Sequence, residues 1–280
     1  MKCLSEIKAK YKKIERIKKG GQKTVYRAIT AENEPVALKL IVNASDPRVM
    51  QEINIVKELE TDNIPTIIES GIAFDESINE NVLYIVEQYV EGISLRDWLL
   101  KGNKADIRFA YKLLKTLLSI EILLEKNKIL HRDINPNNII IGNDGKIYLI
   151  DFGLAKKIGA ASLTRTDALH GPFTPGYAPH EQYANIKMEQ DVRTDLFQIG
   201  VTVYESCKGN NPFVQPSDTI DKIMFRTLSV MPPLLDFEED KKGMFAQLVH
   251  MLMAKNQSQR PDTAEDAMRY LMAIKGTIEF

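Results

Sequence analysis

The spacing of apolar residues changes once along this 280-residue chain, close to residue 90, and this change strongly constrains the fold. Before it, short runs rich in Val, Ile, Leu and Tyr alternate with polar turns, which is typical of β-strands. We expect strands at 22–29, 35–42, 67–74 and 82–90. Apolar residues at helical spacing predict one helix at 48–60.

After residue 92 the helical period dominates, most clearly over 105–127. Further helices are expected at 194–207, 241–255 and 263–274. Two short strands, 139–141 and 146–150, are joined by Gly-Asn-Asp-Gly, a sequence that favours a hairpin. The chain therefore predicts an α+β fold, in which a small antiparallel sheet with one helix precedes a larger, mainly helical part.

Composition excludes several classes of protein. The apolar share of 44% and the charged share of 27% are ordinary for a globular protein, and the net charge of -1 indicates no bulk polyanion as a partner. Two cysteines make neither a disulfide framework nor a metal cluster. The start lacks the apolar core of a signal peptide, and no apolar run is long enough to span a membrane. We therefore expect a cytoplasmic protein without a nucleic-acid or membrane partner.

The first thirty residues are basic, with ten Lys or Arg against two Glu. One interpretation is a solvated face of a strand or helix, which is the common explanation of such charge runs. The other is a docking surface for an acidic partner. The sequence leaves both open.

The most specific chemical signal is His-Arg-Asp-Ile-Asn-Pro-Asn-Asn at 131–138, followed after the predicted hairpin by Asp151-Phe152-Gly153. It supplies a carboxylate, Asp133, then an amide, Asn138, and a second carboxylate, Asp151. Oxygen donors of this kind are the ligands that magnesium prefers. The pattern predicts a base together with two ligands for Mg²⁺.

Two earlier segments add to this signal. Lys39 ends the apolar run Val36-Ala37-Leu38, and a lysine on the inner face of a strand needs a partner or water. Glu52 lies on the helix expected next. The turn before these strands, 18–25, contains Gly20, and a glycine lets backbone N–H groups approach phosphates closely.

Taken together, these segments resemble the signatures of eukaryotic-like (Hanks-type) Ser/Thr protein kinases, over about residues 10–271. The Thr-Pro-Gly-Tyr sequence at 174–177 is similar to that of prokaryotic members. The resemblance implies a bilobal fold, with an N-lobe at 1–88 and a C-lobe at 89–280. It also implies that the active residues lie in a cleft between the lobes.

The resemblance implies binding of ATP with Mg²⁺, or with Mn²⁺ in its place, and transfer of phosphate to a protein substrate. Asp133 would accept the substrate proton, Lys39 would hold the α- and β-phosphates, and Asn135 stands where Ser/Thr kinases place a lysine near the γ-phosphate. Asn138 and Asp151 would hold the metal. Glu52 would be the partner of Lys39. The implied nucleotide-binding residues are Gly20, Val25, Ala37, Lys39, Glu52, Gln88, Val90 and Ile140.

An activation segment is implied at 151–181, and the protein is expected to phosphorylate itself there. The candidate acceptors are Ser162, Thr164, Thr166 and Thr174. Arg132 would pair with a phosphate on this segment. Glu181, Asp195 and Arg260 are expected in structural roles, with Glu181 and Arg260 as an ion pair and Asp195 beneath the catalytic loop.

The chain departs from the family pattern at Lys18, Lys23, Glu87 and Asn135. Glu87 falls behind the expected adenine site, where a carboxylate needs a partner. These departures motivate a second hypothesis, a pseudokinase that binds nucleotide or a partner without turnover. A small-molecule phosphotransferase of the same fold is a third.

Overall fold

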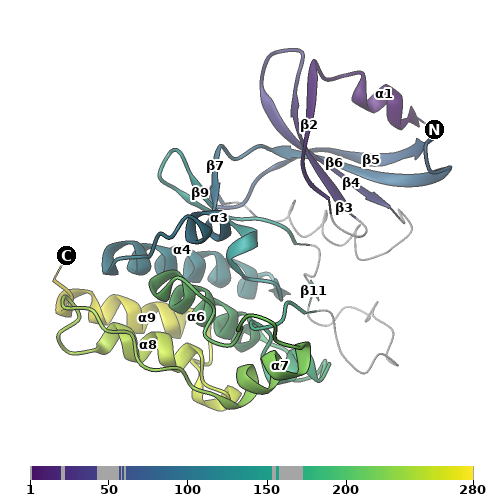
Figure 1. The fold of residues 1–280 in the computed structure, drawn as a ribbon. Coiled ribbons are helices and arrows are strands. Elements are labelled where there is room, and N and C mark those ends of the chain that lie inside the picture. The colour runs from purple at the N-terminus through teal and green to yellow at the C-terminus, as the bar shows by residue number, and fades with distance from the viewer. Residues whose placement is uncertain are drawn as a thin grey trace. The chain divides into compact units, whose positions relative to one another are not determined.

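The computed structural model describes residues 2–19, 23–42, 57, 59, 61–152, 156–157 and 173–279. The chain divides into two compact units, Met1–Glu91 and Gly92–Phe280, each drawn in Figure 1. The first is built on strands and the second on helices, so the predicted α+β class is confirmed. The division into lobes at 88/89 stays a prediction.

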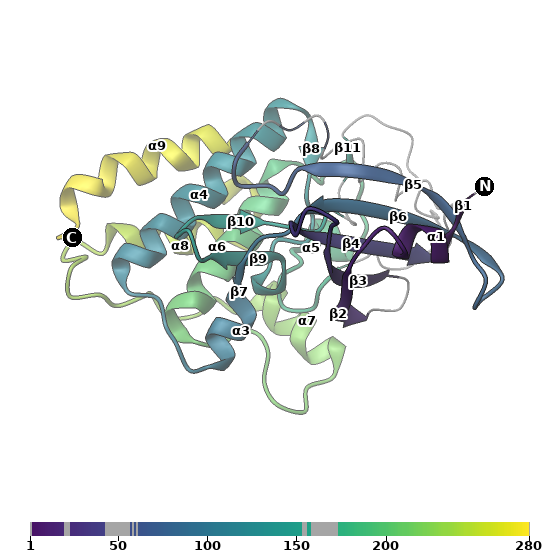
Figure 2. The same cartoon turned by 90° about the horizontal axis from the view of Figure 1, so that it is seen from above.

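Within the described residues, the N-terminal unit contains a six-stranded sheet in the order β1-β5-β6-β4-β3-β2 (Figure 2). The strands are β1 Lys2–Cys3, β2 Lys13–Lys19, β3 Lys23–Ile29, β4 Pro35–Val42, β5 Ile67–Asp75 and β6 Glu80–Gln88. All pairs are antiparallel except β1 with β5. The expected helix at 48–60 lies outside the described residues apart from Lys57 and Leu59.

One face of this sheet is covered by helix α1, Leu4–Lys8. Its Leu4 and Ile7 are buried and belong to the core that Leu38 and Val86 form on the central strands. Five residues are too few to show a helical period, so the sequence did not predict α1. Strand β2 is exposed along most of its length, and its lysines and Arg16 lie at the sheet edge, where charged side chains oppose pairing with another chain.

The described part of the C-terminal unit is mainly helical. Its helices are α3 Leu95–Leu100, α4 Ile107–Lys126, α5 His180–Tyr183, α6 Val192–Lys208, α7 Ile220–Ser229, α8 Met244–Leu252 and α9 Ala264–Ile274. Helix α4 packs on α6 and α9, and α6 packs on α8 (Figure 1). Helix α6 is buried along nearly its whole length, which explains why its apolar pattern is weak at the helical period.

Short strands complete this unit. Strands β7 Gly92–Ser94, β9 Ile139–Gly142 and β10 Ile147–Leu149 form one small sheet, and β8 Ile129–Leu130 pairs with β11 Lys156–Lys157. Strands β9 and β10 form the hairpin that the sequence predicted. In the described residues, none of the helices is both long enough and apolar enough to cross a bilayer.

Candidate active site

The predicted catalytic loop is held in shape by side chains of helix α6. The fully buried Asp195 accepts hydrogen bonds from the backbone N–H groups of His131 and Arg132, both at 2.7 Å. Gln198, further along α6, accepts from the backbone N–H of Ile134 at 2.7 Å. Arg132 has a positive φ of 64°, which few residues other than glycine adopt. Contacts from α6 therefore hold a strained backbone in place.

In the described residues, the carboxylate of Asp133 accepts hydrogen bonds from three side chains. Asn138 donates to Oδ2 at 2.8 Å, Asn135 to Oδ1 at 2.9 Å, and the Thr174 hydroxyl to Oδ1 at 2.6 Å. Burial raises the pKa of Asp133 to about 6; the charge of Asp151 also raises it, whereas the three donors lower it. A carboxylate with this pKa can serve as a general base near neutral pH.

The backbone brings together Asn138 and Asp151, the two predicted magnesium ligands. The N–H of Ile150 donates to the carbonyl of Asn138 at 2.8 Å, so the residue after Ile150 lies next to the loop. Asn138 directs its amide nitrogen to Asp133, and its amide oxygen is the atom suited to a cation. No group of three or more His, Cys, Asp and Glu that could hold a metal occurs in the described residues. The pair fits Mg²⁺, which takes few protein oxygens together with waters and phosphates.

Asn135 also turns toward the predicted base. Its amide nitrogen donates to Asp133, and its amide oxygen accepts from the backbone N–H of Asn137 at 2.9 Å. This second contact caps the short 3-10 helix η1, Pro136–Asn138. Asn135 therefore shapes the loop in this structure, and its contact with a γ-phosphate stays a prediction.

Glu181 and Arg260, predicted as partners, lie together in the core of the C-terminal unit. Arg260 donates to Glu181 at 2.6 Å, and the two side chains are 0% and 4% exposed. Thr194 adds a hydrogen bond to the same carboxylate oxygen at 3.1 Å. Since a buried charge needs a partner, this pair fixes the end of the predicted activation segment to the helices.

Sequence reasoning missed a buried network around Tyr177. Arg96 donates to Glu205 and to the Tyr177 hydroxyl, each at 2.7 Å, and the Tyr177 hydroxyl donates to Glu205. Burial and the charge of Glu205 raise the pKa of Tyr177 well above its usual range. These residues are far apart in the sequence, so no local signal links them.

Two glutamines were missed as well. Gln182 and Gln198 both donate to the carbonyl of Arg132, at 2.8 and 3.0 Å, and Gln198 donates to Gln182 at 2.7 Å. Arg132 itself is 8% exposed. Arg132 is predicted to pair with a phosphorylated residue of the activation segment. Three candidates for that residue lie outside the described residues: Ser162, Thr164 and Thr166.

His131, at the start of the predicted catalytic loop, is fully buried. Its ring meets that of Phe152 edge to face, with centroids 4.6 Å apart. Burial lowers the pKa of His131 to about 4, so the ring is neutral at physiological pH. Its environment suits packing rather than proton transfer.

In the N-terminal unit, Lys39 forms an ion pair with Glu87 at 2.7 Å. Glu87, whose partner the sequence did not reveal, is therefore bound to the predicted phosphate-binding lysine. Val25 is paired with Lys39, and Ala37 with Glu87, so all four share one face of the sheet. Glu52, the predicted partner of Lys39, lies outside the described residues.

The other predicted nucleotide-binding residues are spread over both units. The backbone N–H of Gln88, at the end of β6, donates to the carbonyl of Thr66 at 2.9 Å, and Val90 is 9% exposed. Ile140 belongs to β9 of the C-terminal unit, and Gly20 lies outside the described residues. Ile17 was not among the predicted nucleotide-binding residues. It lies at a β-bulge beside Val25, and its side chain is 53% exposed.

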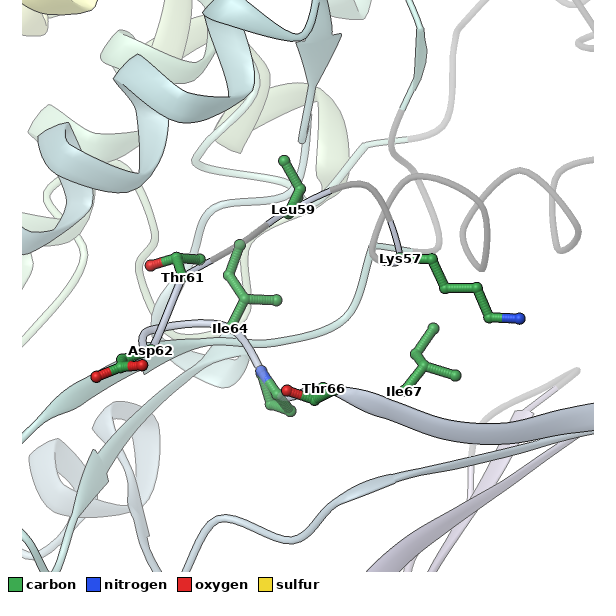
Figure 3. A pocket seen from close by; sticks show the side chains of 8 residues that line it. Lys57, Leu59, Thr61, Asp62, Ile64, Thr66 and Ile67 are labelled. Carbon is green, nitrogen blue, oxygen red and sulfur yellow. The ribbon is translucent and has the colours of Figure 1, made fainter.

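Figure 3 shows a pocket of about 530 Å³ in the N-terminal unit. Its lining residues are Lys57, Leu59, Thr61, Asp62, Ile64, Pro65, Thr66 and Ile67. None of the predicted site residues is among them. We therefore assign no chemistry to this pocket.

Comparison with known proteins places this geometry in context. The family described as protein kinase domain matches residues 11–271. Serine/threonine-protein kinase PknL of Mycobacterium tuberculosis is 28% identical over 251 residues, covering 88% of this chain and 60% of PknL. Serine/threonine-protein kinase cds1 of Schizosaccharomyces pombe is 29% identical over 236 residues, covering 81% of this chain and 49% of cds1. A probable serine/threonine-protein kinase of Dictyostelium discoideum is 31% identical over 245 residues, covering 85% of this chain and 44% of that kinase. The chain thus spans 60% or less of the length of these relatives.

Proposed function

Because the chain belongs to the protein kinase domain family, we propose that it is a serine/threonine protein kinase that transfers the γ-phosphoryl group of ATP to a protein hydroxyl. The similarity to serine/threonine kinases of bacteria and eukaryotes supports this class. A protein substrate and a cytoplasmic location belong to the same proposal.

The observation that carries the proposal is the hydrogen bond between Thr174 and Asp133. A threonine hydroxyl donates to the carboxylate at 2.6 Å, which is the contact that a Ser or Thr substrate needs in order to give up its proton. The amides of Asn135 and Asn138 orient the same carboxylate. A base in this setting supports phosphoryl transfer that relies on positioning and electrostatics.

Each residue has a defined part in the proposed reaction. Asp133 accepts the proton of the substrate hydroxyl as its oxygen attacks the γ-phosphorus, and Lys39 binds the α- and β-phosphates. Asn138 and Asp151 would hold Mg²⁺ or Mn²⁺, which when bound neutralises charge on the β- and γ-phosphates. Autophosphorylation is proposed at Ser162, Thr164, Thr166 or Thr174.

A second candidate function is favoured by the ion pair of Lys39 with Glu87. A carboxylate beside the phosphate-binding lysine repels the phosphates of ATP and therefore opposes their productive placement. This favours a chain that binds nucleotide or a partner without turnover. The third hypothesis, a small-molecule phosphotransferase, has no observation in its favour here.

The experiment that tests the proposal is incubation with ATP and Mg²⁺, followed by intact-mass and phosphopeptide analysis. We expect phosphate on Ser or Thr of the wild type or of a generic protein substrate, and none with Asp133→Asn. Asp236→Asn, an exposed aspartate of the same unit, is the matched control and should keep wild-type activity. Absence of phosphate from the wild type would favour the binding module, and phosphate only on tyrosine would exclude the Ser/Thr class.

A further inference from the structure

Lys39 and Glu87 form a buried ion pair within the N-terminal sheet. The Lys39 ammonium lies 2.7 Å from Glu87 Oε1, and the two side chains expose 6% and 10% of their surface. The strand register pairs Glu87 of β6 with Ala37 of β4, and Lys39 follows two residues later on the same face. The two charged side chains therefore meet diagonally across adjacent strands, within reach of a long side chain.

Apolar side chains lie beside this pair. Ile41, Leu83 and Ile85 lie on the same face of β4 and β6 and are almost fully buried. Leaving either charge alone in such surroundings is costly, so each side chain holds the other in place. Lysine has a flexible four-carbon stem, and its ammonium is fixed only where a partner fixes it.

We propose that Glu87, on the neighbouring strand β6, is a positioning residue for the phosphate-binding ammonium of Lys39. The inference rests on the proposed function, because Lys39 binds phosphates only in a nucleotide-binding protein. An ammonium has three N–H donors, so a bond to Glu87 leaves donors for phosphate oxygens. The contact is anchored at both ends in strands, with Lys39 on β4 and Glu87 on β6.

The first test measures the side chain directly, without catalysis. The apo protein is treated with limiting acetic anhydride, and acetylation of each lysine is followed by mass spectrometry. Since Glu87 occupies and holds the Lys39 nitrogen, Glu87→Gln should speed acetylation of Lys39 roughly tenfold, as expected for loss of one charge-assisted hydrogen bond. Acetylation of Lys10, which pairs with Glu69, should not change.

The second test measures the reaction. We expect Glu87→Gln to lower kcat roughly tenfold, because an ammonium that has lost its contact with Glu87 spends less time in the productive geometry. The KM for ATP should change far less, since the variant also removes a negative charge near the phosphates. Glu87→Asp keeps the charge and should recover part of kcat.

Glu91→Gln is the matched control, because Glu91 forms an ion pair with Arg27 in the same unit, and that pair is 51% and 31% exposed. It should leave the acetylation of Lys39 and kcat unchanged. Thermal unfolding of each variant checks the fold. If Glu87→Gln does not fold, Glu87→Asp, whose shorter side chain weakens the contact with Lys39, should show smaller changes in the same directions in both tests.

The possible results separate the two proposals. If Lys39 reactivity and kcat are both unchanged in Glu87→Gln, the positioning role is wrong while the kinase function stands. If the wild type transfers no phosphate but Lys39 becomes more reactive, the ion pair holds Lys39 and the kinase function is wrong. A fall in kcat with unchanged Lys39 reactivity also contradicts the positioning role.

Discussion

At the scale of single residues, the C-terminal unit is organised by buried ionisable side chains. Asp195 is fully buried beneath the predicted catalytic loop, and burial raises its pKa to about 7, although the N–H groups of Arg132 and His131 lower it. Glu121 on α4 is also fully buried, and neither of its oxygens has a hydrogen-bond partner in the described residues. Burial, followed by the charge of Asp195, raises the pKa of Glu121 well above its usual range.

These shifts predict how stability depends on pH. Because the folded pKa of both carboxyls is raised, the folded state keeps protons that the unfolded chain releases at about pH 4. The stability they contribute is therefore present below that pH and is lost as pH rises through the folded pKa, about 7 for Asp195. Glu121→Gln should raise the free energy of unfolding by about 1–3 kcal/mol at pH 8, and by less at pH 5.

Urea unfolding at the two pH values measures this effect. Glu238→Gln, an exposed glutamate of the same unit, is the control and should change little at either pH. An equal effect of Glu121→Gln at both pH values would show that the carboxyl is not titrating as expected.

At the scale of elements, α6 is the helix on which the candidate site is built. It supplies Asp195 and Gln198 to the catalytic loop, and Glu205 to the network around Tyr177. Its position depends on close packing with α8. A Cβ added at Gly200 would lie 2.8 Å from the Cβ of Leu252, closer than such atoms approach.

Gly200→Ala should therefore destabilise the protein by about 1–3 kcal/mol, since the added methyl overpacks the contact between α6 and α8. The measurement is the midpoint of urea unfolding. The control is Gly276→Ala, because nothing lies within 4 Å of a Cβ built at Gly276. If Gly200→Ala is as stable as the control, α6 and α8 are less tightly packed than the structure shows.

At the scale of the whole molecule, the predicted site residues belong to two compact units. Lys39 and Glu87 belong to the first, whereas Asp133, Asn138 and Asp151 belong to the second. A ligand that contacts the folded protein raises its unfolding temperature by mass action. Nucleotide with metal is therefore expected to stabilise the chain.

ATP with Mg²⁺ should raise the unfolding temperature, and EDTA should remove most of the increase if Asn138 and Asp151 bind the metal. Asp151→Asn should lose most of the same increase while retaining the melting temperature of the apo protein, whereas Asp236→Asn should respond like the wild type. Differential scanning fluorimetry provides the measurement. A full response of Asp151→Asn would exclude Asp151 as a metal ligand.

Local patterns predicted much of this protein. Apolar spacing located β4, β5, β6, α4 and α9 to within a few residues, and the motif around Asp133 identified the loop that the structure places on α6. The pattern failed where elements are short, as for α1 and β1, or where exposed charges dominate a strand, as in β2. Helix α7 was also not predicted, although its apolar residues follow the helical period.

The sequence by itself determined the fold class and the family, because these depend on local period and on fixed spacing along the chain. Apart from the predicted pair of Glu181 and Arg260, only the tertiary structure decided which buried polar side chains are partners. The pairs Lys39–Glu87 and Arg96–Glu205, and the bond from Thr174 to Asp133, join residues far apart in the sequence. Their pairing follows from strand register and helix packing, in which the cost of an unpaired buried charge selects one arrangement that no local pattern encodes.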